Sequence, residues 1–239
     1  MGVIIFNGLS STDYGIIVES PPDYRAPKRR YDVYQVPGRN GDIYVDTGAY
    51  DNVERTYRIA VASHFEHFDT LVTNLADWLY SSNGYCRLED SYDLTHYRIA
   101  AYRDSLDMTN ILNHAGRGAL TFDCKPQRYL KMGDDAVVVS SSLQFTNPTG
   151  YITNPKIIVH GTGTGYFEVN SQRVTLNNLV SSTPVIVDSE EKDIYTSTEN
   201  FNGNATLSDG YPHFLAGTST VRISGGIASL EVIPRWWRI

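Results

Sequence analysis

The sequence predicts a mainly β fold with a single α-helix in its first half. Apolar and polar residues alternate in many short runs, and clusters of Gly, Asn, Ser and Pro separate these runs, as expected of strands and turns. Seventeen of the 239 residues are tyrosines, a residue type enriched in strands. Helical periodicity occurs near residues 64–82 and nowhere after residue 136. We therefore expect a β domain with one helix over residues 1–134 and a β-sandwich over residues 135–239.

The helix is expected over residues 64–82. Its apolar residues, from Phe65 to Leu79, recur at three- and four-residue steps and form one stripe. Ser63 followed by Glu66 matches a capping box at its start, and Asn83-Gly84 is a stop signal at its end. The strands of this domain are expected at 3–6, 16–19, 31–36, 43–46, 53–62, 85–89, 97–103 and 117–124.

A glycine-rich turn separates the two expected strands 31–36 and 43–46. Pro37 fixes its own φ, while Gly38, Gly41 and the intervening Asn40 accept positive φ values that other residues avoid. The segment therefore predicts a β-hairpin with its tip near Arg39.

The sequence of the second half predicts short strands and no helix. We expect them at 137–145, 156–160, 166–169, 173–176, 184–187, 220–224, 228–233 and 235–239, at the spacing of a β-sandwich. The run Gly161-Thr-Gly-Thr-Gly165 follows one of these strands but no helix follows it, so it lacks the helix N-terminus that a dinucleotide phosphate needs. It predicts a bulged β-connection.

Charge, cysteines and the amino terminus limit the function classes. The net charge is −7, so no basic excess favours sequence-specific nucleic-acid binding. Cys86 and Cys124 are expected to be buried thiols of a protein made in a reducing cytosol. The first apolar run ends at Phe6, too short for a signal peptide or a membrane anchor, so no membrane insertion is expected.

No motif predicts catalysis, a cofactor or a metal. His64 and His67 bracket Glu66 but are three residues apart, and we interpret them as the polar flank of the helix. The acidic run from Asp188 to Asp193 lacks the central Gly of a calcium loop, which favours a solvated turn. No nucleophile elbow or catalytic cysteine context is present, and we expect a protein that is not an enzyme.

Aromatic residues in the second half allow a binding function. Trp236 and Trp237 are adjacent on an expected strand, so one ring should enter the core and the other face outward. The alternative function is therefore a carbohydrate-binding module for host cell-wall saccharide, with stacking residues Tyr151, Tyr166, Tyr211, Trp236 and Trp237. A cell-wall hydrolase is a third hypothesis, but no carboxylate pair in the sequence suggests one.

An ordered set of motifs resembles the distal tail protein family of long, flexible-tailed phages. The set spans nearly the whole chain, without an inserted carbohydrate-binding module. It comprises the loop PGRNGD followed by DTGAYDN, the helix ending in WLYSSNGY, and then LTFDCKPQRYL, NPKIIVHGTG, IVDSEEKDIY, YPHFLAGTSTVRI and IPRWWRI.

The resemblance implies a structural virion protein. The N-terminal domain would close into a homo-hexamer ring, and the C-terminal sandwich would have a galectin-like shape. The ring would join the tail tube protein to the tail-tip protein and a receptor-binding protein, with DNA leaving through its lumen. The protein would be assembled in the host bacterial cytoplasm and reside in the virion tail. Pro37, Gly38, Arg39 and Gly41 match the family's loop, with Arg39 as the candidate intersubunit contact.

Overall fold

The computed structural model describes residues 2–62 and 67–239 and confirms a mainly β chain with one α-helix among these residues. Contacts divide the chain into two compact units. The first comprises residues 1–128 together with Ile239, and the second comprises residues 129–238. The sequence predicted this boundary after residue 134, which is the C-cap of the short 3-10 helix Lys131–Gly133. The boundary from the contacts lies six residues earlier.

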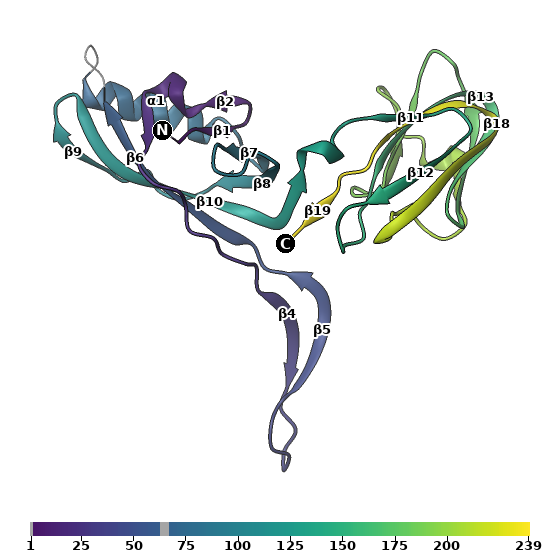
Figure 1. Ribbon diagram of the computed structural model, residues 1–239, viewed down its shortest axis with the longest axis horizontal. Coiled ribbons are helices and arrows are strands. Elements are labelled where there is room, and N and C mark those ends of the chain that lie inside the picture. The colour runs from purple at the N-terminus through teal and green to yellow at the C-terminus, as the bar shows by residue number, and fades with distance from the viewer. Residues whose placement is uncertain (1, 63–66) are drawn as a thin grey trace. The chain divides into compact units, whose positions relative to one another are not determined.

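A large antiparallel sheet forms the first unit (Figure 1). Gly2, just before β1, makes an isolated bridge to Val18 of β3, the strand at the far end of the order. The sheet therefore curls around its core, and among the described residues β2 and β9 each pair with one strand only. The order is β2 (Leu9–Ser10), β1 (Ile4–Phe6), β7 (Cys86–Asp90), β8 (His96–Tyr102), β10 (Ala115–Leu130), β6 (Val53–Ala62) and β3 (Ile16–Val18), with β9 (Met108–Leu112) also on β10.

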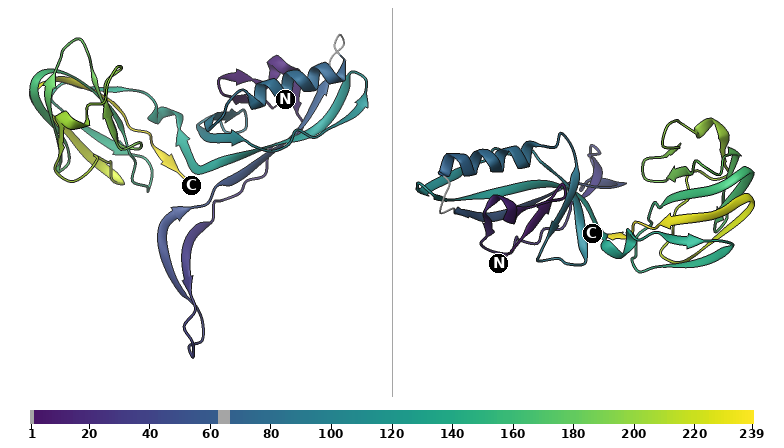
Figure 2. Two further views of the ribbon diagram at one scale, coloured as in Figure 1. Left: turned by 180° about the vertical axis from the view of Figure 1, so that it is seen from behind. Right: turned by 90° about the horizontal axis from the view of Figure 1, so that it is seen from above.

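The helix α1 (Phe68–Tyr80) lies over this sheet (Figure 2). Its buried residues are Phe68, Leu71, Leu75, Trp78 and Leu79, so the predicted apolar stripe is confirmed. The indole N–H of Trp78 donates to the Phe6 carbonyl at 3.2 Å, which fixes the helix to β1. The expected capping box and His64 lie outside the described residues, and the helix ends at Tyr80, before the predicted stop.

The predicted hairpin is present as β4 (Arg29–Tyr34) and β5 (Ile43–Tyr50). The register pairs Val33 with Tyr44 and Tyr34 with Ile43. Within the described residues these two strands pair only with each other and form a separate two-stranded sheet (Figure 1).

The second unit is an all-β body in its described residues, apart from short 3-10 turns, as predicted. Its core contains Phe145, Phe167, Phe214, Leu230 and Trp236. The main order is β11 (Val137–Val139), β18 (Gly217–Ile233), β13 (Lys156–Val169), β14 (Gln172–Leu179) and β17 (Ala205–Leu207); β12 (Ser142–Asn147) pairs with β18, β15 (Val185–Asp188) with β13, and β16 (Asp193–Tyr195) with β15.

The strands β13 and β18 are each continuous where the sequence predicted two strands. The register shifts near Gly161 and Gly165, so the glycine run is a bulged part of a strand, as predicted. A Cβ on Gly161 would lie 2.4 Å from the Gly226 carbonyl oxygen. The glycines therefore permit a close approach of two backbones, which is why the ladder continues through them.

Four short strands were not predicted: β2, β9, β16 and β17. They have two to five residues each, too few for a period-two pattern to stand out. No helix in the described part of the chain is long and apolar enough to cross a membrane.

Candidate assembly surfaces

The β4–β5 hairpin carries the largest run of exposed apolar side chains along consecutive strands. Tyr31, Val33 and Tyr44 are 46%, 50% and 64% exposed, and Tyr34 and Val45 are similar. Isolated exposed apolar residues are ordinary, whereas a contiguous patch marks a binding surface. An isolated hairpin is also only marginally stable in water, so this element gains most from a partner.

Both faces of the hairpin are apolar. The register places Val33 opposite Tyr44 on one face, and Tyr31 meets Tyr44 edge-on with ring centroids 6.0 Å apart. Tyr34 and Val45 lie on the other face by strand alternation. The hairpin can therefore contact neighbours with two faces and two free backbone edges.

Ion pairs order the base of the hairpin. Arg29 pairs with Asp46 across the two strands, and Arg30 pairs with Asp51 just beyond β5. The N–H of Gly48 and the guanidinium of Arg29 lower the pKa of Asp46 below its ordinary value. Because these pairs are exposed, they contribute little stability to the hairpin.

The tip of the hairpin contains the four residues predicted from the family loop. The N–H of Arg39 donates to the Val36 carbonyl at 3.2 Å, and Gly38 has a φ of 79°. Together with Pro37 this is the geometry of a type II turn, so the predicted turn is confirmed. Gly41 has a φ of 83°. All four residues are exposed, and their intersubunit role stays a prediction.

The predicted saccharide-stacking residues lie at separate places in the second unit. Tyr151 stacks on Trp237 with ring centroids 4.5 Å apart. Tyr166 lies under the Arg173 guanidinium, and the Tyr211 hydroxyl donates to Asn202. None of the described ring contacts joins these three places.

The two tryptophans differ in burial, as expected, but only Trp237 lies in a strand, β19 (Trp237–Arg238), which is shorter than the predicted strand 235–239. Trp236 is 4% exposed and packs against Phe214, so its ring is not accessible to a sugar. Trp237 is partly exposed, and its indole N–H donates to the Ile152 carbonyl at 3.0 Å. Only the Tyr151–Trp237 pair remains a compact aromatic surface among the predicted stacking residues.

The acidic run after β15 is not simply a solvated turn. Asp188 is buried and receives two hydrogen bonds from the Arg235 guanidinium, at 2.7 and 2.8 Å. It also accepts the N–H groups of Glu190 and Glu191. The expectation of a solvated turn was wrong for Asp188, because its partner Arg235 is distant in sequence and could not be paired with it by pattern.

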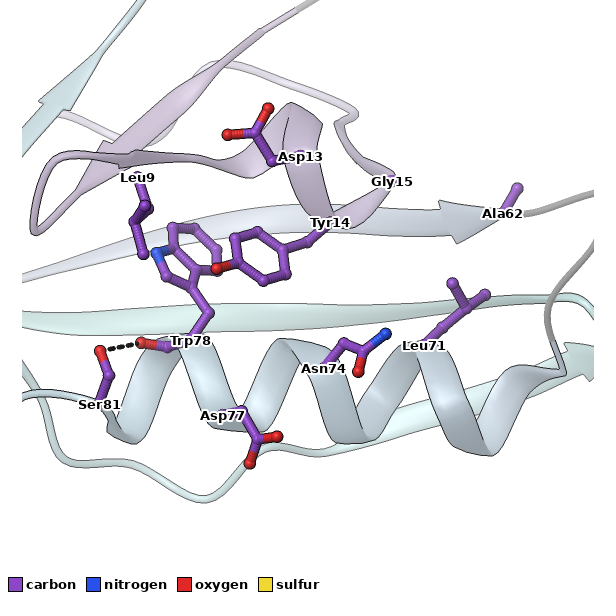
Figure 3. Close-up of a pocket in the computed structure, with 10 residues that line it drawn as sticks. All are labelled: Leu9, Asp13, Tyr14, Gly15, Ala62, Leu71, Asn74, Asp77, Trp78 and Ser81. Atoms are coloured by element: carbon purple, nitrogen blue, oxygen red, sulfur yellow. Dashed lines mark hydrogen bonds between the residues drawn. The ribbon is translucent and has the colours of Figure 1, made fainter.

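A pocket of about 480 Å³ lies between α1 and the segment around the 3-10 helix Ser11–Tyr14 (Figure 3). Tyr14 stacks on Trp78 with centroids 5.0 Å apart and nearly parallel planes, and this pair forms its apolar wall. Asp13 and Asp77 also line it, but Figure 3 shows their carboxylates on different elements and not converging on a common point. The pocket therefore has a mixed polar and apolar lining, without a catalytic arrangement of acids among the residues that line it.

Thiols and imidazoles of the described residues form no metal-binding group of three or more ligands. Cys86 and Cys124 are free thiols, and only Cys124 is fully buried. His67 stacks on His114 with centroids 5.4 Å apart.

The tip and both strands of the hairpin were predicted from the sequence, but the apolar side chains of the strands were not singled out as a contact surface. The sequence does contain a pattern that indicates this surface. Apolar side chains occur on both faces of two short strands, next to charged residues; they are Tyr31, Val33, Tyr34, Tyr44 and Val45. A strand with one buried face would show apolar residues on alternate positions only.

Comparisons with known proteins identify the fold. No family model matches the sequence, and no curated protein matches it. Among solved structures, the SPP1 Dit protein, described as a hub adsorption apparatus of phages that infect Gram-positive hosts, is 12% identical with a TM-score of 0.72, over 97% of this chain and 98% of that chain. Two structures of the phage p2 baseplate in its activated conformation, with strontium and with calcium, are each 10% identical with TM-scores of 0.57. They cover 100% and 97% of this chain, and 97% of the matched chain in both cases. The resemblance to phage distal tail proteins is thus confirmed at the level of the fold.

Proposed function

We propose that this chain is a structural component of a phage tail tip, in which six copies close into a ring at the end of the tail tube. The ring would connect the tail tube protein to the tail-tip protein and the receptor-binding protein and leave a lumen for DNA. The fold shared with SPP1 Dit and the phage p2 baseplate supports the tail-tip role. Assembly in the host cytoplasm and residence in the virion tail follow from the same role.

The observation that carries the proposal is the exposed β4–β5 hairpin. A head-to-tail ring requires each subunit to present two different surfaces. The hairpin supplies one of them, since it offers apolar faces and unpaired backbone edges that a single copy leaves in water. The acidic net charge of −7 agrees with a lumen that lets DNA pass without retaining it.

Light scattering coupled to size-exclusion chromatography tests the ring. We expect a species of about six times 26.8 kDa, and a closed ring in negative-stain images. A particle that stays monomeric at high concentration, with the chain folded, would overturn the proposal. If the hexamer forms, its binding to the purified tail-tip protein of the same virion is the next measurement.

A second candidate function is saccharide binding at the Tyr151–Trp237 pair. The pair is compact and partly exposed, which suits stacking on a sugar ring. A saccharide array with the wild-type protein and the Trp237→Ser variant tests it. Signals that vanish in the variant would support binding, and an array without signals for an intact ring would remove this function.

A further inference from the structure

The proposed ring, on which the following proposal rests, needs a second surface on each subunit that receives the β4–β5 hairpin of the next copy. A free backbone edge is the natural partner of a hairpin whose own edges are unpaired. Among the described residues of the first unit, β9 pairs only with β10 and β2 pairs only with β1 (Figure 1). These two edge strands are therefore the candidates.

Strand β9 is the more exposed of the two. Four of its five residues are exposed, and the adjacent side chains of Ile111 and Leu112 are 54% and 67% exposed. Neighbours on a strand point to opposite faces, so this end of β9 leaves both faces in water. Strand β2 has only two residues, of which Leu9 is 42% exposed. The larger uncovered aliphatic surface is thus the end of β9.

Strand β9 is also held in place before any partner arrives. Its register places Leu112 opposite Ala115 of β10. The Phe68 N–H at the start of α1 donates to the Asn113 carbonyl at 2.8 Å, which fixes the turn that follows β9. A surface that is already ordered loses little conformational entropy when it binds, so β9 suits a docking edge.

The hairpin carries a hollow that fits aliphatic side chains. A recess of about 310 Å³ is lined by the apolar residues Tyr31, Val33 and Tyr44, and we call it the hairpin recess. Its other lining residues are polar or charged, among them Lys28 and Asp51. An apolar centre with a polar rim is the usual anatomy of a protein interface. Strand β9 has the sequence MTNIL, without a charged residue, so it brings no like charge to this rim.

The exposed area of the hairpin agrees with a contact between copies. Tyr31, Tyr34 and Tyr44 are 46%, 55% and 64% exposed. At about 150–250 Å² for each tyrosine, these three side chains leave about 250–400 Å² in water. That is about a third to a half of the roughly 800 Å² that each partner buries in a stable interface. The backbone edges and the polar rim would supply the rest.

We propose that Leu112 of one copy docks in the hairpin recess of the next copy, with Ile111 covered at its margin. The occupant of the recess is thus a second copy of this chain. The two elements differ, aliphatic on β9 and aromatic on the hairpin, so the contacts run head to tail and can close into a ring. Among the described residues, one chain does not pair these strands with each other, so the contact is made only between copies.

Complementation between two variants tests this pairing. Leu112→Asp disrupts the β9 side and Tyr44→Asp disrupts the hairpin side, and each should weaken self-assembly by at least about tenfold per contact, because a carboxylate replaces a buried apolar group. An equal mixture should form a dimer of about twice 26.8 kDa, because one intact β9 then meets one intact hairpin while the remaining sides are both disrupted. Light scattering measures the mass, and circular dichroism checks the fold. Leu94→Asp is the matched control, since Leu94 is 74% exposed between β7 and β8, and it should assemble like the wild type.

A photoreactive cross-linker gives a direct readout that does not depend on disrupted variants. The substitution Leu112→p-benzoylphenylalanine should yield cross-links to residues 29–50 of another copy, recognised in mass spectra from a mixture of isotope-labelled and unlabelled protein.

The outcomes separate this contact from the ring itself. A hexameric wild type with Leu112→Asp assembling equally well would overturn the docking on β9 and leave the ring intact. Cross-links from position 112 to another part of the neighbour, or a mixture of the two variants that stays monomeric, would overturn the docking as well. A wild type that stays monomeric would remove the ring and the docking together.

Discussion

Replacement of Tyr44 by Ser tests whether the hairpin is a subunit contact. Tyr44 is 64% exposed on β5, so its loss removes little from the stability of one copy. In the proposed hexamer, the phenol group of Tyr44 would be buried at a subunit interface. Tyr31, whose side chain meets that of Tyr44 edge-on, would be buried with it. The variant therefore separates the stability of the subunit from the stability of the assembly.

The magnitude follows from the area that Tyr44 still exposes. With 64% exposure of a side chain that buries about 150–250 Å², about 100–160 Å² remain to be buried, which at about 25 cal/mol per Å² gives about 2–4 kcal/mol per interface. Each 1.4 kcal/mol is about a tenfold change in a dissociation constant. We therefore expect each interface to weaken by at least about 30-fold.

The assay is light scattering over a dilution series, with circular dichroism to confirm the fold. Leu94→Ser is the matched control, because Leu94 is 74% exposed in the turn between β7 and β8 and lies outside the hairpin. Tyr44→Ser should dissociate at higher protein concentration than the wild type, and Leu94→Ser should not. Dissociation curves that coincide for Tyr44→Ser and wild type would refute the role of the hairpin.

Three further predictions concern the stability and reactivity of each unit. Asp188→Asn leaves Arg235 without its buried partner and should cost about 3–5 kcal/mol in urea unfolding. Burial alone would raise the pKa of Asp188, but the bonds and charge of Arg235 outweigh it and hold the pKa below its ordinary value. This contribution should thus be present above the unfolded pKa of about 3.9 and fade as pH falls through the lower folded pKa; a variant with wild-type stability at pH 7 would contradict it. Gly226→Ala places a Cβ 1.9 Å from the Thr162 carbonyl oxygen and should lower the Tm, whereas Gly203→Ala, with open space around it, should not. Iodoacetamide at pH 8 should label Cys86 well before Cys124 in a mass spectrum, because burial raises the pKa of the Cys124 thiol to about 12; equal labelling of the folded protein would be inconsistent with this burial.

Local patterns predicted local structure well. The stripe from Phe68 to Leu79 identified α1, and Pro37-Gly38 identified the turn at the hairpin tip, because both depend on residues close in sequence. The glycines at 161–165 were recognised as a bulge, but the continuity of β13 through them was not. That continuity depends on Gly226, a residue far along the chain whose close approach no local pattern reveals.

The charged contacts could not be predicted from the sequence either, because each one joins residues that are far apart in the chain. Asp188 meets Arg235 and Asp90 meets Arg55 only after strands from distant segments pair. Strand alternation places Arg55 on the same face of β6 as Tyr57 and Ile59, and in the fold this face is the core side of the sheet. A charged residue on a core face signals a buried network, and its partners require the three-dimensional fold.

Among the described residues, the hairpin leaves two unpaired backbone edges and two apolar faces in water, which favours assembly through it. A single isolated bridge joins Gly2, just before β1, to Val18 of β3, so only part of the edge of the main sheet is covered. The strands β4 and β5 keep their outer edges unpaired within the described residues, and their apolar faces remain in water. A contact through the hairpin would satisfy those backbone groups and cover those side chains together.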